Sequence, residues 1–397
     1  MTTMASTASS SSVLNEELLK RCQSRAAGYD RDNTFFQEDF EELRDSGYTK
    51  MGVPKEFGGA GMNLAEVMAE TRRLAYYAPA TAVGLNMHVY WTGLCADVSR
   101  SGDTSMDWLL KKAGEGDIFA AGHAEGGNDI PILLSTTSAE KVDGGYRFNG
   151  RKSFGTLTPI YDWLGFHALD TSDPDAPKVV HAFMPKGAEG STIIEEWDSL
   201  GMRATQSQGT KLDNVFVPDE YIARAVPAGF GGADLFVLGI FMWALTGFAN
   251  VYYGIGERAL DIAVEAVKSK SSVALTRPMS YHPEIQHSIA DMTMKLDSIR
   301  AQIDTIAREW SEGVDYGAMY VSKVISAKYT ATVGSFEVVD AALDLIGGFG
   351  INRASEIERL FRDSRLGRIH PANAALTYEI VGKLALGISP DEQPRWG

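Results

Sequence analysis

The sequence predicts an α+β protein in three successive parts: helices, then short strands, then a bundle of long helices. Two changes in the spacing of apolar residues support this order. Apolar residues recur every three or four positions in the first and last parts, which is typical of helices, and alternate in the middle part, which is typical of strands. We place the three parts at residues 13–118, 119–226 and 227–397, after a tail at residues 1–12.

The composition excludes several function classes. With 397 residues, 44% of them hydrophobic, the chain is long enough to bury a sizeable core. Its net charge of −15 disfavours nucleic acid as a partner, because no basic excess is available to neutralise phosphates. Cys22 and Cys95 cannot form a disulfide framework and match no metal motif, so we expect a reducing cytoplasm and no metal. Residues 1–12 lack the basic and apolar regions of a secretion signal, and we expect them to be disordered.

The first part is predicted to be helical up to about Ile118. The segments VLNEELLKRCQSRAAGYDRD and FQEDFEELRDSGY carry apolar residues at helical spacing. The turn-forming segment GVPKEFGGAGMN interrupts them, and LAEVMAETRRLAYYAP resumes the helical pattern.

The middle part is predicted to be a β domain. The segment GGYRFNGRKSF begins with a Gly-Gly turn and then places five residues at alternate positions, as in a strand: Tyr146, Phe148, Gly150, Lys152 and Phe154. The segments KVVHAFMP, STIIEEW and TKLDNVFVP are predicted to be further short strands, each bounded by Gly, Pro or Asp.

The last part returns to helical spacing. Seven apolar residues step by four and three along one predicted helix, as a helix packed lengthwise in a bundle requires: Ile285, Ile289, Met292, Leu296, Ile299, Ile303 and Ile306. Before it, residues 235–256 carry no charge and approach the length of a membrane span. Glycines, Thr246 and Asn250 interrupt this segment and no basic cluster flanks it, so we expect a buried helix and no membrane.

Five motifs in order resemble the acyl-CoA dehydrogenase superfamily over nearly the whole chain. They are GVPKEFGGAGMNLAE, GYRFNGRKSFGT, WDSLGMRATQSQGTKLDNVFVP, HSIADMTMKLDSIR and LIGGFGINRASEIERLFRDSR. The resemblance implies an N-terminal helical domain, a middle β-barrel domain and a C-terminal four-helix bundle, assembled as a dimer of dimers. It also implies a flavin between the middle and C-terminal domains, which we expect to be FAD, with FMN as the alternative.

The resemblance implies positions for this flavin. Its ring would pack against Phe154, with Ser153 and Thr156 near the N5 edge, although Phe154 and Thr156 would also suit ordinary strand positions, one packing and one solvated. Gly347 and Gly348 would let the backbone approach the diphosphate of a neighbouring subunit's flavin, because they have no Cβ. A helix C-cap would explain the two glycines equally well.

The catalytic base of the family is missing from this sequence. A dehydrogenase needs a carboxylate that takes the α proton of a thioester while a hydride passes to the flavin. At the usual position of that glutamate the sequence has His370 and Pro371, and Asn373 replaces a threonine that contacts the flavin. A second branch of the family takes its base from the apolar helix, where this chain has Ala244 and Leu245.

Three further departures concern the flavin site. The family's TEPxAGSD becomes GHAEGGND, in which His123 and Asn128 replace Glu and Ser while Asp129 is kept. The arginine that clasps the diphosphate is absent from KSKSSVALT, where Lys270 is the nearest cation and offers only a point charge. Asp344 replaces a glutamine and would repel a diphosphate.

This combination resembles the monooxygenase branch of the superfamily. Those enzymes take reduced flavin from a separate reductase, form a C4a-hydroperoxide with oxygen, and hydroxylate aromatic carbons, amines or sulfur. They need no α-proton base, but they need a dry pocket and hydrogen-bond donors. We therefore expect a small-molecule substrate and FADH2 supplied by a flavin reductase.

Three residues are the candidates for catalysis. His370 and Asn373 lie in the loop that lacks the glutamate, where they would donate to the oxidant or steer the substrate. His123 lies next to the strand expected under the flavin. The ordinary alternative for His370 is a partly buried ring whose nitrogens are satisfied by the backbone.

His88, Tyr90 and Trp91 are predicted to line the substrate cavity. The resemblance places His88 at the cavity wall, and its two aromatic neighbours would suit an aromatic substrate. Plain helix packing is the alternative for all three.

Two other functions remain open. The first is a divergent acyl-CoA dehydrogenase whose base comes from Asp129, Asp234 or Glu379. The second is a flavin-binding subunit without a base, which would need a companion chain.

Overall fold

The computed structural model describes residues 12–317 and 319–392. The tail predicted at residues 1–12 therefore lies outside the described residues, except for Ser12. The Ser12 hydroxyl donates to Glu70 Oε2 over 2.9 Å, which ties the start of the described chain to the helix Leu64–Tyr77.

Helices make up the first part of the described chain. They are α1 (Glu16–Asp32), α2 (Gln37–Asp45), α3 (Leu64–Tyr77), α4 (Pro79–Arg100) and α5 (Asp107–Glu115). Asn15 caps α1 by accepting from Leu18 N, and Asn63 forms a capping box with Glu66 at the start of α3. The helix α4 is buried along nearly its whole length and contacts both the sheet and the C-terminal helices, so it joins all parts of the molecule.

The middle part is an eight-stranded sheet in the order β6-β7-β3-β2-β4-β5-β8, with β1 parallel to β4. The strands are β1 (Phe119–Gly122), β2 (Ser138–Val142), β3 (Gly145–Gly155), β4 (Trp163–Asp170), β5 (Lys178–Pro185), β6 (Ser191–Ile194), β7 (Gln208–Pro218) and β8 (Ile222–Pro227). The pairing of β3 with β7 shifts register between Lys152 and Gly155. This irregularity shapes the candidate site described below.

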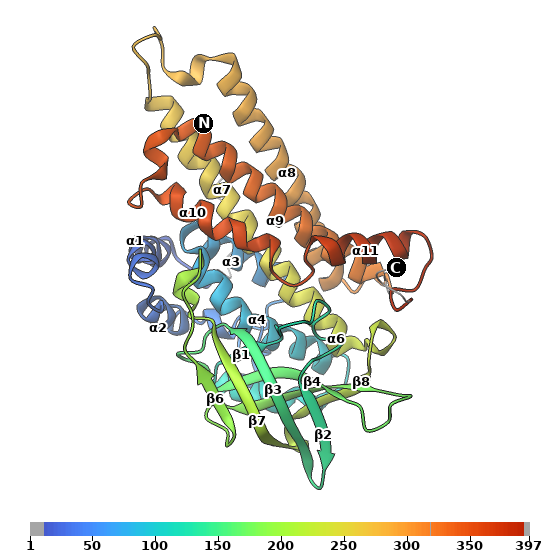
Figure 1. Ribbon diagram of the computed structural model, residues 1–397. Coiled ribbons are helices and arrows are strands. Elements are labelled where there is room, and N and C mark those ends of the chain that lie inside the picture. Colours follow the sequence, from blue (N-terminus) through green and yellow to red (C-terminus); the bar gives the residue numbers. More distant parts are fainter. Residues whose placement is uncertain (1–11, 318, 393–397) are drawn as a thin grey trace.

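Long helices form the last part. They are α6 (Leu235–Ile240), a π-helical segment (Phe241–Leu245), α7 (Thr246–Ser269), α8 (Pro283–Ser311), α9 (Met319–Ile346), α10 (Glu356–Arg365) and α11 (Ala374–Ala385). The helices α7, α8 and α9 run side by side away from the sheet (Figure 1). The predicted apolar seam of α8 is buried from Met292 to Ile306, whereas Ile285 and Ile289 near its start are only partly buried.

The apolar segment after the sheet is a core helix. The stretch Leu235–Ser269 is long and apolar enough to cross a membrane, but 89% of its most apolar window is buried inside the protein. Helices, sheet and helices follow one another along the chain, which confirms the predicted α+β fold.

Candidate active site

Phe154 is a large aromatic side chain left bare at the end of β3. It is 61% exposed, although Phe148 and Lys152, at the preceding alternate positions, are buried. The cause is the register shift between Lys152 and Gly155, where Phe154 adopts a left-handed backbone with φ 56°. Trp197 contacts the bare ring edge-on, with ring centroids 6.2 Å apart. A strained backbone that presents an uncovered aromatic ring is typical of a binding surface.

Hydroxyl groups accompany the bare ring. Ser153 and Thr156, on either side of Phe154 in the chain, are both partly exposed. Thr156 Oγ1 is 2.7 Å from Ser207 Oγ, which is in turn 2.8 Å from Thr205 Oγ1. The predicted ring contact and the two predicted edge residues thus lie on one short stretch of chain.

His123 lies next to this surface. An isolated strand bridge pairs Ala124, the residue after His123, with Ser153, the residue before Phe154. His123 Nε2 is 2.9 Å from Tyr90 Oη, and its Nδ1 is 3.1 Å from His167 Nδ1. Burial, assisted by neighbouring positive groups, lowers the pKa of His123 to about 3, so the ring is neutral near pH 7.

A buried ion pair follows His123. Lys152 Nζ is 2.5 Å from Glu125 Oε1, and the two side chains are 1% and 0% exposed. Burial alone would raise the pKa of Glu125, but the Lys152 charge and several donated hydrogen bonds lower it to about 2. Burial lowers the pKa of Lys152 to about 8. Sequence reasoning missed this pair, although the alternation along β3 already places Lys152 on the same face as the buried Phe148.

Asn128, a predicted cofactor contact, is used within its own loop. Its Nδ2 donates to Glu125 Oε2 over 2.9 Å and to Leu134 O over 2.7 Å, and its Oδ1 accepts from Ile130 N over 3.1 Å. The geometry gives Asn128 a part in holding Glu125, and a direct contact with the cofactor stays a prediction. The neighbouring Asp129 is exposed.

The three predicted pocket residues of α4 are buried. Both ring nitrogens of His88 are taken by the backbone: Nε2 is 2.9 Å from Thr49 O, and Nδ1 accepts from Phe119 N over 3.1 Å. The Trp91 indole also donates to a backbone carbonyl oxygen. This geometry matches helix packing for His88 and Trp91 and does not support a place at a cavity wall. Only Tyr90 turns its hydroxyl towards a predicted site residue, His123.

The loop of His370 is held by a ring stack and by a buried lysine. The His370 ring stacks on Phe248, with centroids 4.3 Å apart and planes 25° apart, and its buried Nε2 has no hydrogen-bond partner among the described residues. Lys328 Nζ donates to the carbonyl oxygens of His370 and Ala372 over 3.1 and 3.2 Å, and Ala372 has a left-handed backbone with φ 57°. Asn373 Oδ1 caps α11 by accepting from a backbone N–H.

The charges around this loop keep His370 neutral. Burial, together with the Lys328 charge, lowers the pKa of His370 to about 3. Burial alone lowers the pKa of Lys328 to about 7. A neutral imidazole carries one nitrogen that donates and one that accepts.

Neither position at which the resemblance predicts the family base holds an acid. The loop offers His370 and Pro371, and the apolar helix offers Ala244, which lies buried in the π-helical segment. Such segments are frequent at functional sites. Of the alternative acids, Asp234 accepts from an arginine Nε over 2.9 Å and caps α6, and Glu379 accepts from a lysine Nζ over 2.8 Å.

Gly347, Gly348 and Lys270 come together at the end of α9. Gly347 has φ 73°. Lys270 Nζ donates to Ile346 O over 2.9 Å, and a Cβ on Gly347 would lie 3.3 Å from that nitrogen. Gly348 is exposed and the Phe349 ring after it is 84% exposed. A turn without side chains beside a cation suits a phosphate group.

The described residues suit a flavin better than a metal ion. The bare Phe154 ring can contact an aromatic ring system, and the Gly347 turn with Lys270 can receive a phosphate. Within residues 12–317 and 319–392, no three His, Cys, Asp or Glu side chains gather closely enough to hold a metal ion.

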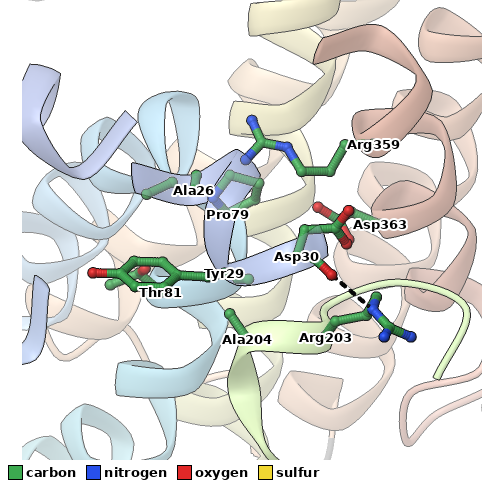
Figure 2. Close-up of a pocket in the computed structure, with 11 residues that line it drawn as sticks. Ala26, Tyr29, Asp30, Pro79, Thr81, Arg203, Ala204, Arg359 and Asp363 are labelled. Carbon is green, nitrogen blue, oxygen red and sulfur yellow. Dashed lines mark hydrogen bonds between the residues drawn. The ribbon is translucent and has the colours of Figure 1, made fainter. Parts of the chain in front are cut away.

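A small cavity lies where α1, α4, residues 203–204 and α10 meet (Figure 2). Its volume is about 10 Å³, which leaves room for one water molecule at most. Arg203 Nε donates to Asp30 O over 2.8 Å at its edge, and Arg359 Nε has no partner among the described residues. Burial raises the pKa of Asp363, which also lines it, to about 6.

A larger cavity opens where α6 begins. Its volume is about 910 Å³, within the range of small-molecule sites. Asp97 lies in its wall and accepts from the indoles of Trp243 and Trp310 over 2.6 and 2.8 Å. Aromatic and aliphatic residues line much of the rest, among them Phe230, Leu235, Leu238, Tyr320 and Leu384.

Two family models match the chain. Residues 12–116 match the N-terminal domain of acyl-CoA dehydrogenases, and residues 246–374 match their C-terminal domain. The two matches fall on the helical parts on either side of the sheet. The chain belongs to the acyl-CoA dehydrogenase superfamily. The predicted family is therefore confirmed.

Members of this superfamily that resemble the chain differ in activity. The putative acyl-CoA dehydrogenase YdbM of Bacillus subtilis is 26% identical over 366 residues, which cover 91% of this chain and 92% of YdbM. The L-evernosamine nitrososynthase of a Micromonospora species is 25% identical over 385 residues, which cover 94% and 89%. The solved structure of KijD3 with FMN and a dTDP-linked amino sugar superposes with a TM-score of 0.83 at 23% identity, over 95% of this chain and 93% of KijD3. These similarities support a flavin cofactor. They include both dehydrogenases and oxygen-transferring enzymes, so they do not decide which of the two activities this chain has.

Proposed function

We propose that this protein is a flavin-dependent monooxygenase. The observation that carries the proposal is the lack of a carboxyl group at both family base positions, the described loop His370–Asn373 and Ala244. A base removes the α proton of a thioester only from within hydrogen-bond reach. Asp234 and Glu379, two of the three alternative acids, are each engaged by a basic side chain. This constellation favours oxygen transfer over desaturation.

The chemistry divides between the cofactor and the chain. A bound reduced flavin supplies the two electrons with which molecular oxygen gives one atom to the substrate and the other to water. The chain has to hold the flavin ring, exclude water and place hydrogen-bonding groups near the reacting oxygen. Phe154 provides the ring contact, and His370 from the bundle provides a neutral imidazole whose Nε2 has no partner among the described residues. His123 from the β domain is also neutral, and Tyr90 and His167 hold its ring in place.

We infer a small substrate that is hydroxylated at an aromatic carbon, an amine or a sulfur atom. The cavity of about 910 Å³ supports this size, and its aromatic lining suits such a molecule. The helix α6 starts in the wall of this cavity and leads within ten residues to Ala244. The cavity would then be the outer part of the path to the reacting centre.

The flavin is proposed to be FADH2 that a separate reductase supplies, with FMN as the alternative. The ammonium group of Lys270, which follows α7, stands at the turn that would receive the phosphates, and the exposed Asp344 lies on the last turn of α9, just before that turn. A point charge opposed by a carboxylate holds an anion weakly, which suits a flavin that exchanges between two proteins.

We also propose that the protein forms a homo-oligomer, a dimer of dimers, in the cytoplasm. Phe349 and Ile351, beside the Gly347 turn, are 84% and 70% exposed, and a second copy of the chain would cover them. Cys22 and Cys95 are buried free thiols, as a reducing compartment allows.

A two-arm assay tests the proposed function. In the first arm the pure protein receives NADH, a flavin reductase, FAD, ¹⁸O-labelled oxygen and a panel of indole, amine and thioether compounds. In the second arm it receives butyryl-CoA and an artificial electron acceptor. We expect one ¹⁸O atom in a product of the first arm and no dye reduction in the second. Dye reduction without labelled product would overturn the proposal, and silence in both arms would favour a subunit that needs a companion chain.

A further inference from the structure

The cavity of about 910 Å³ has an acidic wall. Among the described residues that line it, the charged side chains are four aspartates and one arginine: Asp97, Asp234, Asp315, Asp391 and Arg100. They come from α4, from the start of α6, from the segment between α8 and α9, and from the segment after α11. Carboxylates that are far apart in the chain thus meet around one opening that is large enough for a small molecule.

Two of the four carboxylates are balanced by an arginine. Arg100 Nη1 donates to Asp97 Oδ1, and Arg224 Nε donates to Asp234 Oδ2 over 2.9 Å. Asp234 also caps α6 by accepting from Val237 N over 3.0 Å. These two aspartates therefore hold the wall together and leave little charge for a ligand.

The other two carboxylates are bound only by backbone groups among the described residues. Asp315 Oδ1 accepts from Gly317 N over 2.8 Å. Asp391 accepts from Phe230 N over 2.8 Å and from Gly231 N over 3.0 Å. No basic side chain within residues 12–317 and 319–392 forms an ion pair with either aspartate, so two negative charges without a counter-charge line the cavity.

Aromatic rings line the same cavity. The rings of Trp310 and Tyr320 stand nearly at right angles, with centroids 5.1 Å apart and planes 82° apart. Trp310 Nε1 donates to Asp97 Oδ2 over 2.8 Å, which fixes the indole beside the acidic wall. The face of an aromatic ring attracts a cation that lies within about 6 Å of its centre. Carboxylates and aromatic rings in one cavity therefore suit an organic cation better than a neutral or anionic molecule.

The exposure of the aspartates orients such a cation. Asp315 and Asp391 are exposed and so lie at the mouth of the cavity, whereas Asp97 is partly buried. Asp97 Oδ2 also accepts from Trp243 Nε1 over 2.6 Å, and Trp243 directly precedes Ala244, one of the two positions that lack a carboxylate. The positive end of a bound molecule would therefore lie at the mouth, and its other end would point towards Ala244.

We propose that this cavity binds an organic cation, and that the substrate carries its positive charge apart from the atom that is oxidised. The two unpaired aspartates attract the charge, the two aromatic rings contact the carbon atoms around it, and an anionic molecule is repelled. Among the substrates of the proposed function, this wall selects those with an ammonium or similar group at one end. The oxidation of the bound molecule rests on the proposed function, whereas the binding of a cation does not.

Three probes of similar size and different charge test this selectivity in the intact protein, without flavin or reductase. They are 2-phenylethylamine, 2-phenylethanol and phenylacetate, which are cationic, neutral and anionic at pH 7. Isothermal titration calorimetry measures their affinities. We expect the amine to bind at least about tenfold more tightly than the alcohol, and phenylacetate to bind no more tightly than the alcohol. Benzyltrimethylammonium should bind like the amine, because the attraction depends on the charge and not on an N–H group.

A double variant locates the binding. Asp315→Asn with Asp391→Asn removes the two unpaired charges and keeps one acceptor oxygen at each position for the backbone. We expect the affinity for the amine to fall at least about fivefold, while the affinity for the alcohol stays within about twofold. Asp297→Asn with Asp340→Asn is the matched control, because it makes the same change of net charge at exposed positions of α8 and α9 outside the cavity. It should leave the affinity for the amine within about twofold of the wild type.

The outcomes separate the cation site from the proposed function. Equal affinities for the amine and the alcohol would overturn the cation site, as would no measurable binding of the amine or an equal loss of affinity in the two double variants. Selective binding of the amine by a protein that transfers no ¹⁸O would remove the proposed function and leave the cation site standing. Transfer of ¹⁸O to neutral compounds, without selective binding of the amine, would leave the proposed function standing and overturn the cation site.

Discussion

The two histidines of the candidate site lie in opposite environments. His123 has a hydrogen-bonding partner at each ring nitrogen, whereas the buried Nε2 of His370 has no partner among the described residues. An unsatisfied buried polar group costs about 1–3 kcal/mol, and a water molecule, an ion or a ligand that bonds to it removes this cost. We infer from this difference that His123 is set in place before the reaction, while His370 awaits a bound molecule.

A buried lysine lies near each histidine, and the two lysines also differ in their partners. Lys152 faces the carboxylate of Glu125, whereas Lys328 donates only to carbonyl oxygens. The first lysine is half of a closed ion pair in the β domain. The second is a buried lysine with a lowered pKa that holds a strained loop of the bundle. We therefore expect substitutions at the two lysines to differ most in the unfolding free energy that they cost.

The largest effect is expected from Lys152→Met. This change leaves Glu125 buried without its counter-charge, which costs about 3–5 kcal/mol of unfolding free energy. Urea denaturation measures the loss. Lys328→Met is the matched control and should cost less near pH 7, because no carboxylate loses a partner. Adding Glu125→Gln to Lys152→Met should recover part of the lost unfolding free energy, because the buried charge is removed. A loss below about 1 kcal/mol for Lys152→Met would contradict the expected difference between the two lysines.

His370→Ala should affect turnover more than stability. Loss of a hydrogen-bonding group at the reacting oxygen reduces a rate about 10²-fold. We expect product formation to fall towards that extent and hydrogen peroxide release to increase. His287→Ala, at an exposed position of α8, is the control and should change neither. Unchanged coupling in His370→Ala would show that the unpartnered nitrogen serves another purpose.

A smaller effect is expected in the pH dependence of stability. Burial lowers the pKa of Lys328 from 10.5 to about 7 in the folded state. Between these values the unfolded chain binds more protons, so stability conferred by this site rises with pH from about 7 to 10.5. The unfolding free energy of the wild type, minus that of Lys328→Met, should increase across this window. A difference that is flat or falls with pH would contradict a depressed pKa.

The smallest effect on stability is expected from Phe154→Gly. Glycine tolerates the φ of 56° and removes an exposed ring, so stability should stay level or rise by up to about 1 kcal/mol. Flavin affinity should nevertheless fall, because the ring contact is lost. Thermal denaturation and fluorescence titration with FAD and FMN measure the two effects. Unaltered affinity for both flavins would place the cofactor elsewhere.

Local patterns predicted the fold well. The segment KVVHAFMP coincides with β5, and α8 begins at the predicted Pro283. Both features depend on residues close together in the chain, where spacing and helix-start chemistry act directly. The same locality explains the buried apolar helix, since its glycines and Asn250 are visible in the sequence.

The polar interior of the site was less predictable. Glu125, in the loop after β1, and His167, on β4, both contact Lys152 on β3, and no short pattern encodes such distances. The outward turn of Phe154 depends on a register shift against β7, which reverses what alternation alone predicts. His88 resembles a pocket residue in the sequence but is satisfied by the backbone in the fold.

One experiment probes the missing base most directly. The flavin-loaded protein is mixed with butyryl-CoA in the absence of oxygen, and the visible absorbance of the flavin is followed. We predict that the absorbance stays constant, because neither the loop His370–Asn373 nor Ala244 offers a carboxylate to the α carbon. Rapid bleaching of the flavin by the thioester would contradict this account and identify the protein as a dehydrogenase.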